Sequence, residues 1–235
     1  MQAILTFDLE FWYDSEFLKD YVPPDAETRP DYVLESTELL LDLLKKQNVK
    51  ATFFVLGKLA EKYPGLIKKI FDEGHEIASH GYSHKTLPDL KEGDFEREIA
   101  LTNEILKQIT GKNPTLFRAP AFSLKHDDLQ SLNILKKYNL ENISKHPALA
   151  GGIYFRIMTL RLFSCYLKAA SGRKIPILYF HPHEFFKESP KINDGPLFKR
   201  KIKYIGTNNA WEKFKKMMIL FQFVSIKQYY ESATD

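Results

Sequence analysis

The chain has 235 residues, of which 44% are hydrophobic, which is enough for one large domain or two small ones with a sizeable core. The 34 basic residues are nearly balanced by 30 acidic ones, and no DNA- or RNA-reading motif appears, which argues against a nucleic-acid-binding protein. The one cysteine, Cys165, excludes an internal disulfide and fits a reducing compartment.

The N-terminal sequence, MQAILTFDLEFW, does not resemble a secretory signal. Such a signal needs a positive start and about 7–15 apolar residues. Here the apolar run is short and ends at Asp8. No apolar run approaches the ~20 residues of a membrane span either. We therefore expect a soluble, cytoplasmic protein whose contact with a membrane is at most peripheral.

Short apolar runs alternate with amphipathic segments along the chain. We expect strands at residues 3–7, 50–56, 75–78, 115–118, 175–180 and 223–224. We expect helices at residues 31–47, 59–74 with a break at Pro64, 92–109, 126–138 and 207–222 with Thr207 as N-cap. This alternation predicts an α/β fold with a largely parallel sheet or barrel.

Residues 144–172 are the hardest to place, and we treat them as a candidate insertion in a single domain spanning 1–235. Within them, RIMTLRLFSCYLKAA is expected to form a helix with an apolar face. Packing into the core is the preferred interpretation of that face, and contact with substrate or membrane is the alternative. The basic run at 199–203 is interpreted as a solvated face, with an anionic ligand or membrane surface as the alternative.

Ionisable residues follow several of the expected strands. In parallel α/β folds, functional groups gather at the carboxyl ends of strands. Arg118 is followed by Pro120, and Pro182 lies between two histidines. The ionisable residues at these positions are Asp8, Glu10, His80, His84, Arg118, His181, His183 and Glu184.

A metal site is the preferred interpretation of the first four. Asp8 and Glu10 are two residues apart, so an extended strand points both the same way, and a cation would relieve their repulsion. His80, His84 and one carboxylate supply the three ligands typical of a catalytic zinc site, which activates water. Zinc is the expected ion, and cobalt, nickel or iron would also suit these ligands. The alternatives are a cap or ion pair for the carboxylates and an exposed pair for the histidines.

The remaining groups suit acid–base chemistry. Asp8 could take a proton from water, Arg118 could hold Asp8 in an ion pair, and His181 could protonate a leaving group. A surface charge is the alternative for Arg118, and a polar strand end is the alternative for His181. The other histidines, His75, His126 and His146, are interpreted as structural or without a partner.

The chain resembles the polysaccharide deacetylases of the NodB-homology type, carbohydrate esterase family four. The matching segments are TFDLE at 6–10, FRAP at 117–120, ILYFHPHE at 177–184 and, the most specific, ATFFVLGKLAEKYPGLIKKIFDEGHEIASHGYSH at 51–84. The resemblance implies a distorted (β/α)7 barrel. It also implies metal-dependent hydrolysis of an amide that is not a peptide bond, usually the N-acetyl group of a sugar.

The resemblance also implies roles for individual residues. Asp8 matches the general base, Arg118 the residue that orients it, and His181 the general acid. His80 and His84 match the metal-binding histidines. The N–H of Ala121, which follows Pro120, matches a donor to the oxyanion. In the aromatic run at 11–13, Trp12 is a candidate surface for a sugar ring, with packing of the barrel mouth as the alternative.

Two departures from the family pattern concern the site. Leu9 stands where a second, metal-binding aspartate is common, and Glu10 is the expected replacement. Sequences with this spacing form a subgroup that includes cytoplasmic deacetylases and amide hydrolases. The segment KYNLENISKHP lacks the Asp and Trp that usually support the general acid, so Glu184 or His183 would take that part.

Together these features predict a cytoplasmic deacetylase. Its expected substrate is a small-molecule or lipid-linked N-acetylated sugar. The sugar would be attached to a nucleotide or to a lipid and used in surface-glycan biosynthesis. A hydrolase of a non-sugar amide or ureide is the first alternative. An inactive carbohydrate-binding protein is the second.

Overall fold

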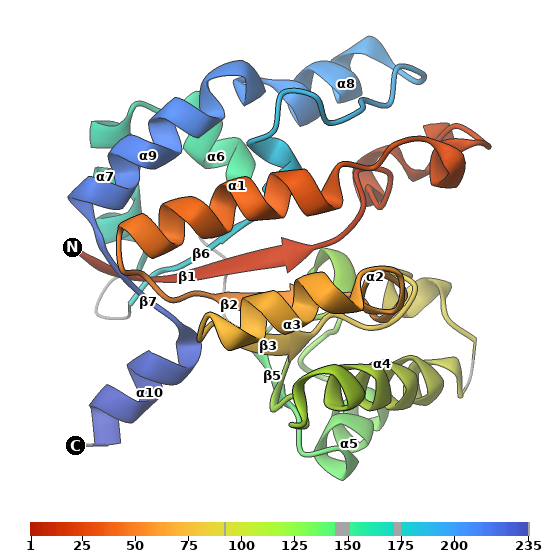
Figure 1. The fold of residues 1–235 in the computed structure, drawn as a ribbon. Helices are drawn as coiled ribbons and strands as arrows, with labels where there is room; N and C mark the ends of the chain where they lie inside the picture. The colour runs from red at the N-terminus through yellow and green to blue at the C-terminus, as the bar shows by residue number, and fades with distance from the viewer. Residues whose placement is uncertain (92, 144–150, 172–174, 235) are drawn as a thin grey trace. The chain divides into compact units, whose positions relative to one another are not determined.

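The computed structural model describes all residues except 92, 144–150, 172–174 and 235 (Figure 1). The chain forms two compact units. The first unit takes Met1–Leu5, Phe11–Lys50 and Ala148–Val224. The second unit takes Thr6–Glu10, Ala51–Pro147 and Ser225–Asp235. Strand β1 (Gln2–Leu9) therefore contributes its first half to one unit and its second half to the other.

The second unit is built on parallel strands. They are ordered β5-β4-β3-β2-β1, and each neighbouring pair is parallel. All four residues of β2 are buried, as expected for a parallel strand with both faces covered. The register pairs Asp8 with Phe54, Phe54 with Ala78 and Ser79 with Phe117, so the carboxyl ends of these strands are aligned. The strands that follow β1 are β2 (Thr52–Val55), β3 (Glu76–Ser79), β4 (Leu116–Phe117) and β5 (Glu141–Asn142).

Helices pack around these strands, with α3 and α4 beside β3 (Figure 1). Pro64 begins α3, where its missing N–H costs no hydrogen bond, so the expected break in the 59–74 segment is confirmed. Phe95 and Ile99 of α4 pack against Phe117 in one apolar cluster. The helices are α2 (Gly57–Lys62), α3 (Pro64–Asp72), η3 (Leu87–Asp89), α4 (Asp94–Thr110), η4 (Pro120–Phe122), α5 (Leu129–Lys137) and α10 (Ile226–Thr234).

In the first unit, β1 pairs with β6 (Ile177–Phe180) and, in parallel, with β7 (Gln222–Val224). Its core is aromatic: the buried rings of Phe155, Phe163, Phe180, Phe185 and Phe214 meet at tilted or edge-to-face angles. The helices are η1 (Glu16–Tyr21), η2 (Ala26–Thr28), α1 (Val33–Lys46), α6 (Gly152–Ile157), α7 (Leu160–Ser171), η6 (Pro182–Glu184), α8 (Leu197–Tyr204), η7 (Thr207–Asn209) and α9 (Ala210–Leu220).

The predicted α/β class is confirmed, and each expected strand has a counterpart. The apolar helix expected in the 144–172 region is present as α7, and Phe163 and Leu167 are buried, which supports core packing. The prediction of an insertion lies partly outside the described residues, and the single-domain prediction stays a prediction. Several short elements were not expected, among them β5, α6, α8 and the 3-10 helices.

The predicted cap at Thr207 is wrong. Its hydroxyl donates to the carbonyl of Tyr204 at 3.0 Å, because a 3-10 turn over 207–209 precedes the α-helix. Asn209 occupies the N-cap position of α9.

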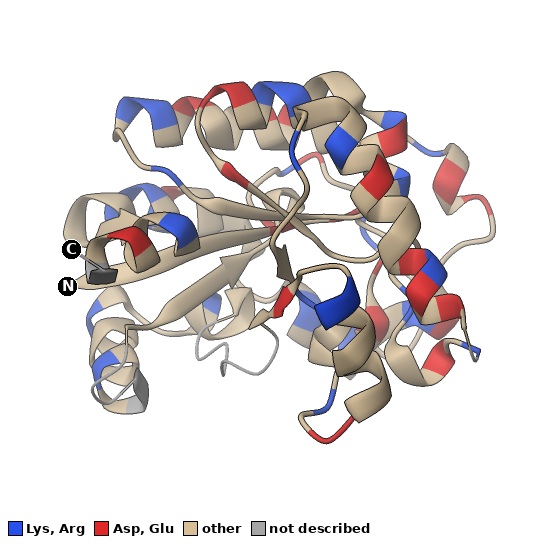
Figure 2. Cartoon of the chain, turned by 90° about the horizontal axis from the view of Figure 1, so that it is seen from below, with Lys and Arg blue, Asp and Glu red and all other residues tan. Residues whose placement is uncertain are grey.

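Basic and acidic residues are interspersed over most helices, as Figure 2 shows. The basic run at 199–203, predicted to be a solvated face, lies in α8, where no residue is buried. Among the described residues, no helix combines the length and apolar character needed to cross a bilayer.

Candidate metal centre and catalytic residues

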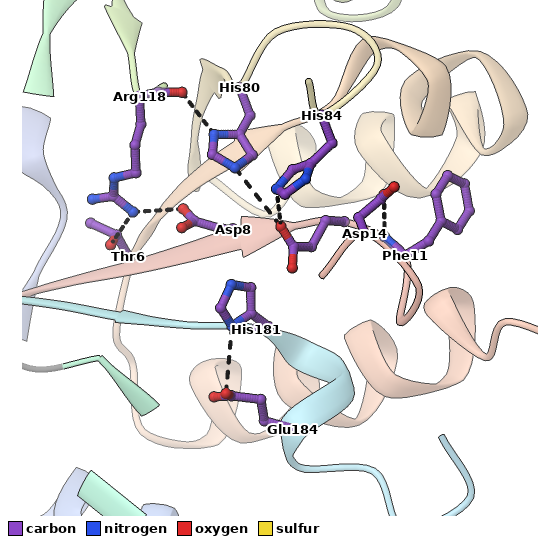
Figure 3. Close-up of polar contacts among 10 residues, drawn as sticks. Thr6, Asp8, Phe11, Asp14, His80, His84, Arg118, His181 and Glu184 are labelled. Atoms are coloured by element: carbon purple, nitrogen blue, oxygen red, sulfur yellow. Dashed lines mark hydrogen bonds and ion pairs between the residues drawn. The ribbon is translucent and has the colours of Figure 1, made fainter. Parts of the chain in front are cut away.

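The structure brings together five of the predicted site residues in the second unit (Figure 3). Asp8 and Glu10 come from the end of β1, His80 and His84 follow β3, and Arg118 follows β4. Because these parallel strands are in register, their carboxyl ends bring the side chains to the same edge of the sheet. Each of these residues is buried or nearly so.

The candidate metal ligands are Glu10, His80 and His84. The Oε2 atom of Glu10 lies 2.8 Å from Nε2 of His84 and 3.9 Å from Nε2 of His80. One ligand atom from each of the three residues lies within 4.8 Å of the others. Two atoms at about 2.1 Å from a tetrahedral zinc ion lie roughly 3.4 Å apart, so this spacing fits ligands of one cation.

His80 is held as the neutral tautomer whose Nε2 can bind a metal. Its Nδ1 lies 2.7 Å from the carbonyl oxygen of Arg118, which can only accept a hydrogen bond. Nδ1 therefore carries the proton, and the lone pair of Nε2 faces Glu10. Burial lowers the pKa of His80 to about 4, so the ring is neutral at pH 7. Two imidazoles and one carboxylate, with one ring oriented from behind, fit a divalent cation such as zinc.

The loop that carries His84 is fixed by hydrogen bonds from two helices. The N–H groups of Gly57 and Lys58, at the start of α2, donate to the carbonyls of Gly81 and Tyr82 at 2.9 and 3.2 Å. A Cβ on Gly57 would come within 2.5 Å of the Tyr82 ring, so glycine is required there. His84 itself has a left-handed φ of 63°, a sparsely populated conformation that the surrounding contacts maintain.

Glu98 of α4, which was not among the predicted site residues, supports the same loop. Its Oε2 accepts hydrogen bonds from the N–H groups of Tyr82 at 2.7 Å and Ser83 at 2.8 Å. Its Oε1 accepts the Ser83 hydroxyl at 2.6 Å. No spacing in the sequence points to Glu98, because it is one of several acidic residues on a polar helix.

Arg118 positions both the candidate base and a candidate ligand. Its Nη1 donates to Asp8 Oδ1 at 2.6 Å and to the Thr6 hydroxyl at 3.0 Å. Its guanidinium lies 3.9 Å from the centre of the Phe54 ring, and the residue is 1% exposed. Its carbonyl orients His80, as described above. The charged, stacked arrangement leaves Arg118 and Asp8 little freedom to move.

The turn after Arg118 contains the predicted oxyanion donor. Pro120 begins the turn, and Ala121 and Phe122 both have left-handed φ values, of 50° and 54°. Phe122 and Ser123 donate the two backbone hydrogen bonds of the turn, so neither bond uses the N–H of Ala121. Consecutive N–H groups in such a conformation can form an anion-binding concavity.

The predicted general acid, His181, lies at the end of β6 in the first unit. Its Nδ1 is 3.6 Å from Glu184 Oε1, a contact shown in Figure 3. The ring of His183 stacks on that of His181, with 5.3 Å between centres. Glu184 is therefore the residue of the first unit that is placed to orient His181.

Arg156, which was not among the predicted site residues either, holds Glu184 in place. It forms an ion pair with Glu184 Oε1 and donates to the carbonyls of Lys203 at 2.7 Å and Ile205 at 2.9 Å. Burial alone would raise the pKa of Glu184, but the charge of Arg156 and the contact with His181 lower it overall. A Cβ on Gly152 would collide with this carboxylate, which explains the glycine there.

The structure favours packing over sugar binding for Trp12. This side chain is 2% exposed and belongs to an apolar cluster with Leu18, Ala26 and Ile192 in the first unit. His75 is structural, as predicted, since its Nδ1 accepts the N–H of Ala51 at 3.2 Å. His126 is exposed, and His146 lies outside the described residues.

Residues 25–143, about half of the chain, match the family model described as polysaccharide deacetylase. The chain therefore belongs to the polysaccharide deacetylase family, of the NodB or carbohydrate esterase family 4 type. Residues 135–231 match a second model, described as a domain of unknown function (DUF3473). Glu184 and Arg156 both lie in this second segment.

A curated relative is the peptidoglycan-N-acetylglucosamine deacetylase of Bacillus cereus, 43% identical over 97 residues. The match covers 41% of this chain and 35% of that protein, so the chain spans about a third of the relative's length. The peptidoglycan deacetylase PdaC from Bacillus subtilis has a similar structure, with a TM-score of 0.62, 20% identity and coverage of 99% of this chain and 91% of that one.

BA3943 from Bacillus anthracis, described as a CE4 family pseudoenzyme, also has a similar structure. The TM-score is 0.60 at 17% identity, with coverage of 97% of this chain and 64% of that one. These likenesses show the fold, and the predicted (β/α)7 barrel type is confirmed at that level.

Proposed function

We propose that this protein is a metal-dependent hydrolase that removes the N-acetyl group from a sugar. The observation that carries the proposal is the convergence of Glu10, His80 and His84 next to Asp8, which Arg118 holds. Membership of the polysaccharide deacetylase family supports it. A relative with a similar sequence is named for the deacetylation of N-acetylglucosamine in peptidoglycan, which supports a sugar amide as the substrate.

The candidate residues of the second unit have different roles in the attack of water on the amide. A divalent cation held by the three ligands would supply a Lewis acid for the acyl oxygen and make water a nucleophile near neutral pH. Zinc is the proposed ion, with cobalt, nickel or iron as alternatives. Asp8 takes the proton that water loses on attack, while its hydrogen bond from Arg118 keeps the carboxylate aimed. The N–H of Ala121 donates to the developing oxyanion.

His181 is the proposed proton donor to the leaving nitrogen, so that the amide and water become an amine and acetate. The contact between Nδ1 of His181 and Glu184 supports this role, because it orients the ring and leaves Nε2 for the transfer. Glu184 replaces the supporting aspartate that the usual family motif would supply.

The proposed substrate is an N-acetylated sugar linked to a nucleotide or a lipid, in cytoplasmic assembly of a surface glycan. The TFDLE motif supports this finer proposal, because its spacing resembles the subgroup that includes cytoplasmic deacetylases. A non-sugar amide or ureide is the alternative, since the same ligands and base would serve it.

A substrate panel tests the proposal. The purified protein, loaded with zinc or cobalt, is incubated with a nucleotide-linked N-acetylhexosamine, a lipid-linked one, a peptidoglycan fragment and a simple non-sugar amide. Release of acetate from one of the sugars, lost in Asp8→Asn, is the expected result. Release of acid only from the non-sugar amide would select the alternative substrate class.

An inactive carbohydrate-binding protein is the second candidate, because a protein of similar structure is described as a pseudoenzyme. The presence of Asp8 and of all three candidate ligands favours the active enzyme. Binding of a sugar without release of acetate from any member of the panel would favour the second candidate.

A further inference from the structure

Helix α8 presents its apolar side chains to solvent. Leu197 is 58% exposed, Phe198 62%, Ile202 44% and Ile205, directly after the helix, 48%. None of the residues in the helix is buried. An amphipathic surface helix normally turns its apolar stripe toward the core, so the orientation of α8 is reversed.

This reversal is set by contacts on the inner side of the helix. The ring of Tyr204 packs against the Trp12 cluster, and its hydroxyl accepts the N–H of Ile192 at 2.7 Å. Lys199 lies over the rings of Phe17 and Tyr21, 5.6 Å from each ring centre. With 3.6 residues per turn, Phe198 and Ile202 lie one turn apart on the side away from Tyr204, and Lys199 lies at the border between the two sides.

The C-terminal end of α8 is fixed as well. The buried Arg156 donates to the carbonyls of Lys203 and Ile205. Phe17 of η1, next to Lys199, is 42% exposed and extends the apolar surface beyond the helix. The exposed side chains therefore belong to a well-anchored element at the periphery of the first unit (Figure 1).

The charge of this segment is of one sign. Residues 197–205, LFKRKIKYI, contain four basic residues and no acidic one. Helices α1 to α4, α9 and α10 carry both signs, while α5, α6 and α7 also lack acidic residues but hold at most two basic ones each. A helix that carries exposed apolar side chains next to basic ones suits an anionic lipid surface. The apolar side chains enter the boundary between headgroups and acyl chains, and the basic ones attract the lipid phosphates. Pairing of two such helices across a two-fold axis would bring like charges together.

We propose that α8 docks the protein on anionic membranes, with Leu197, Phe198 and Ile202 entering the bilayer interface. Lys201, which is exposed, contacts the lipid phosphates, and Lys199, Arg200 and Lys203 add positive charge close to that surface. This inference does not depend on the proposed deacetylase activity, because no residue of the candidate metal centre takes part in it.

Vesicle co-sedimentation of the full chain tests the proposal. Vesicles of phosphatidylcholine with about 30% phosphatidylglycerol are compared with pure phosphatidylcholine at low and high salt. We expect binding to the anionic vesicles that weakens with salt, since exposed charges are screened. Phe198→Ser/Ile202→Ser should weaken it about tenfold or more. Reversal of Lys199, Arg200 and Lys201 to Glu should weaken it at least about a hundredfold.

The matched control is Ile219→Ser/Leu220→Ser on α9, where the two side chains are 74% and 59% exposed. This control and Asp8→Asn should bind like the wild type, whatever the enzyme assay shows. Equal binding to neutral and anionic vesicles, or equal loss in the α9 control, would overturn the proposal. So would a concentration-dependent dimer that Phe198→Ser/Ile202→Ser abolishes, since the face would then bind a second copy.

Discussion

The two ends of the sheet in the second unit both hold buried polar residues, but they use them differently. At the carboxyl ends, the ligand atoms of Glu10, His80 and His84 face one another. At the amino ends, Glu76 Oε2 accepts the N–H of Lys227 at 3.1 Å and the hydroxyl of Thr52 at 2.6 Å. His75, at the same end, accepts the N–H of Ala51.

The hydrogen bonds at the amino ends connect the sheet to α10. The hydroxyl of Thr52 accepts the N–H of Ile226, at the start of this helix, at 2.9 Å. Polar atoms that accept backbone N–H groups serve the fold, because buried N–H groups need partners. Side chains that converge on a common point, with a ring oriented from behind, serve a ligand. This difference separates the structural His75 from the functional candidate His80.

The largest expected effect comes from Asp8→Asn. The asparagine oxygen can still accept from Arg118, so the fold and the metal content should persist. Loss of the base should lower kcat about 10²–10⁴-fold, with a smaller change in KM. The measurement is acetate release at saturating substrate. A change of less than about fivefold in kcat would remove Asp8 from the chemistry.

His80→Ala and His75→Ala test whether the histidines at the two ends of the sheet have different roles. The wild type should bind about one zinc or cobalt ion, and His80→Ala and Glu10→Ala should lose most of it. His75→Ala should keep the metal and lose about 1–3 kcal/mol of unfolding free energy, because the N–H of Ala51 loses its acceptor. Metal analysis and urea unfolding separate the two effects, and metal loss in His75→Ala would break the comparison.

Glu98→Gln should weaken the metal centre without removing a ligand. A glutamine cannot accept all three hydrogen bonds from the Tyr82 and Ser83 groups, so the loop before His84 should loosen. Metal affinity should fall about 10–100-fold, measured by competition with a chelator. Glu104→Gln, on the exposed side of the same helix, is the matched control. Equal affinities for the two variants would show that Glu98 has no such role.

Glu184→Gln should change how stability depends on pH. The pKa of Glu184 is lowered in the folded state, so its stabilisation is present above the unfolded value of about 4.3 and is lost as the pH falls below it. The wild type should therefore lose about 1–3 kcal/mol more than the variant between pH 6 and 3. Urea midpoints over this range provide the measurement, and parallel curves would contradict the prediction.

The smallest effect, of opposite sign, is expected for Glu76→Gln. Burial raises the pKa of Glu76, because its partners Thr52 and Lys227 compensate the charge less than burial penalises it. Its contribution is present below about pH 4.3 and is lost as the pH rises through the higher folded pKa. The wild type should lose up to about 1 kcal/mol relative to the variant on going from pH 4 to 7. The same stability change in both proteins would argue against this account.

The sequence by itself determined the α/β class and named the residues that meet at the candidate metal centre. Asp8, Glu10, His80, His84 and Arg118 follow apolar runs that could be recognised as strands, and parallel strands present their carboxyl ends at one edge. Each residue at that edge can therefore contact only the few side chains that end the neighbouring strands. This physical constraint, together with the family motif, is why these residues could be named before their contacts were known.

Only the tertiary structure decided which distant residues support the site and which faces point outward. Glu98 and Arg156 act through hydrogen bonds to segments far along the chain, and no local pattern distinguishes them from other charged residues on helices. Trp12 was a candidate for sugar binding, but the Leu18 and Ile192 side chains enclose it. The period of α8 indicates an apolar stripe, yet its direction depends on where Tyr204 finds a partner, because periodicity relates positions within a helix and not a helix to its surroundings.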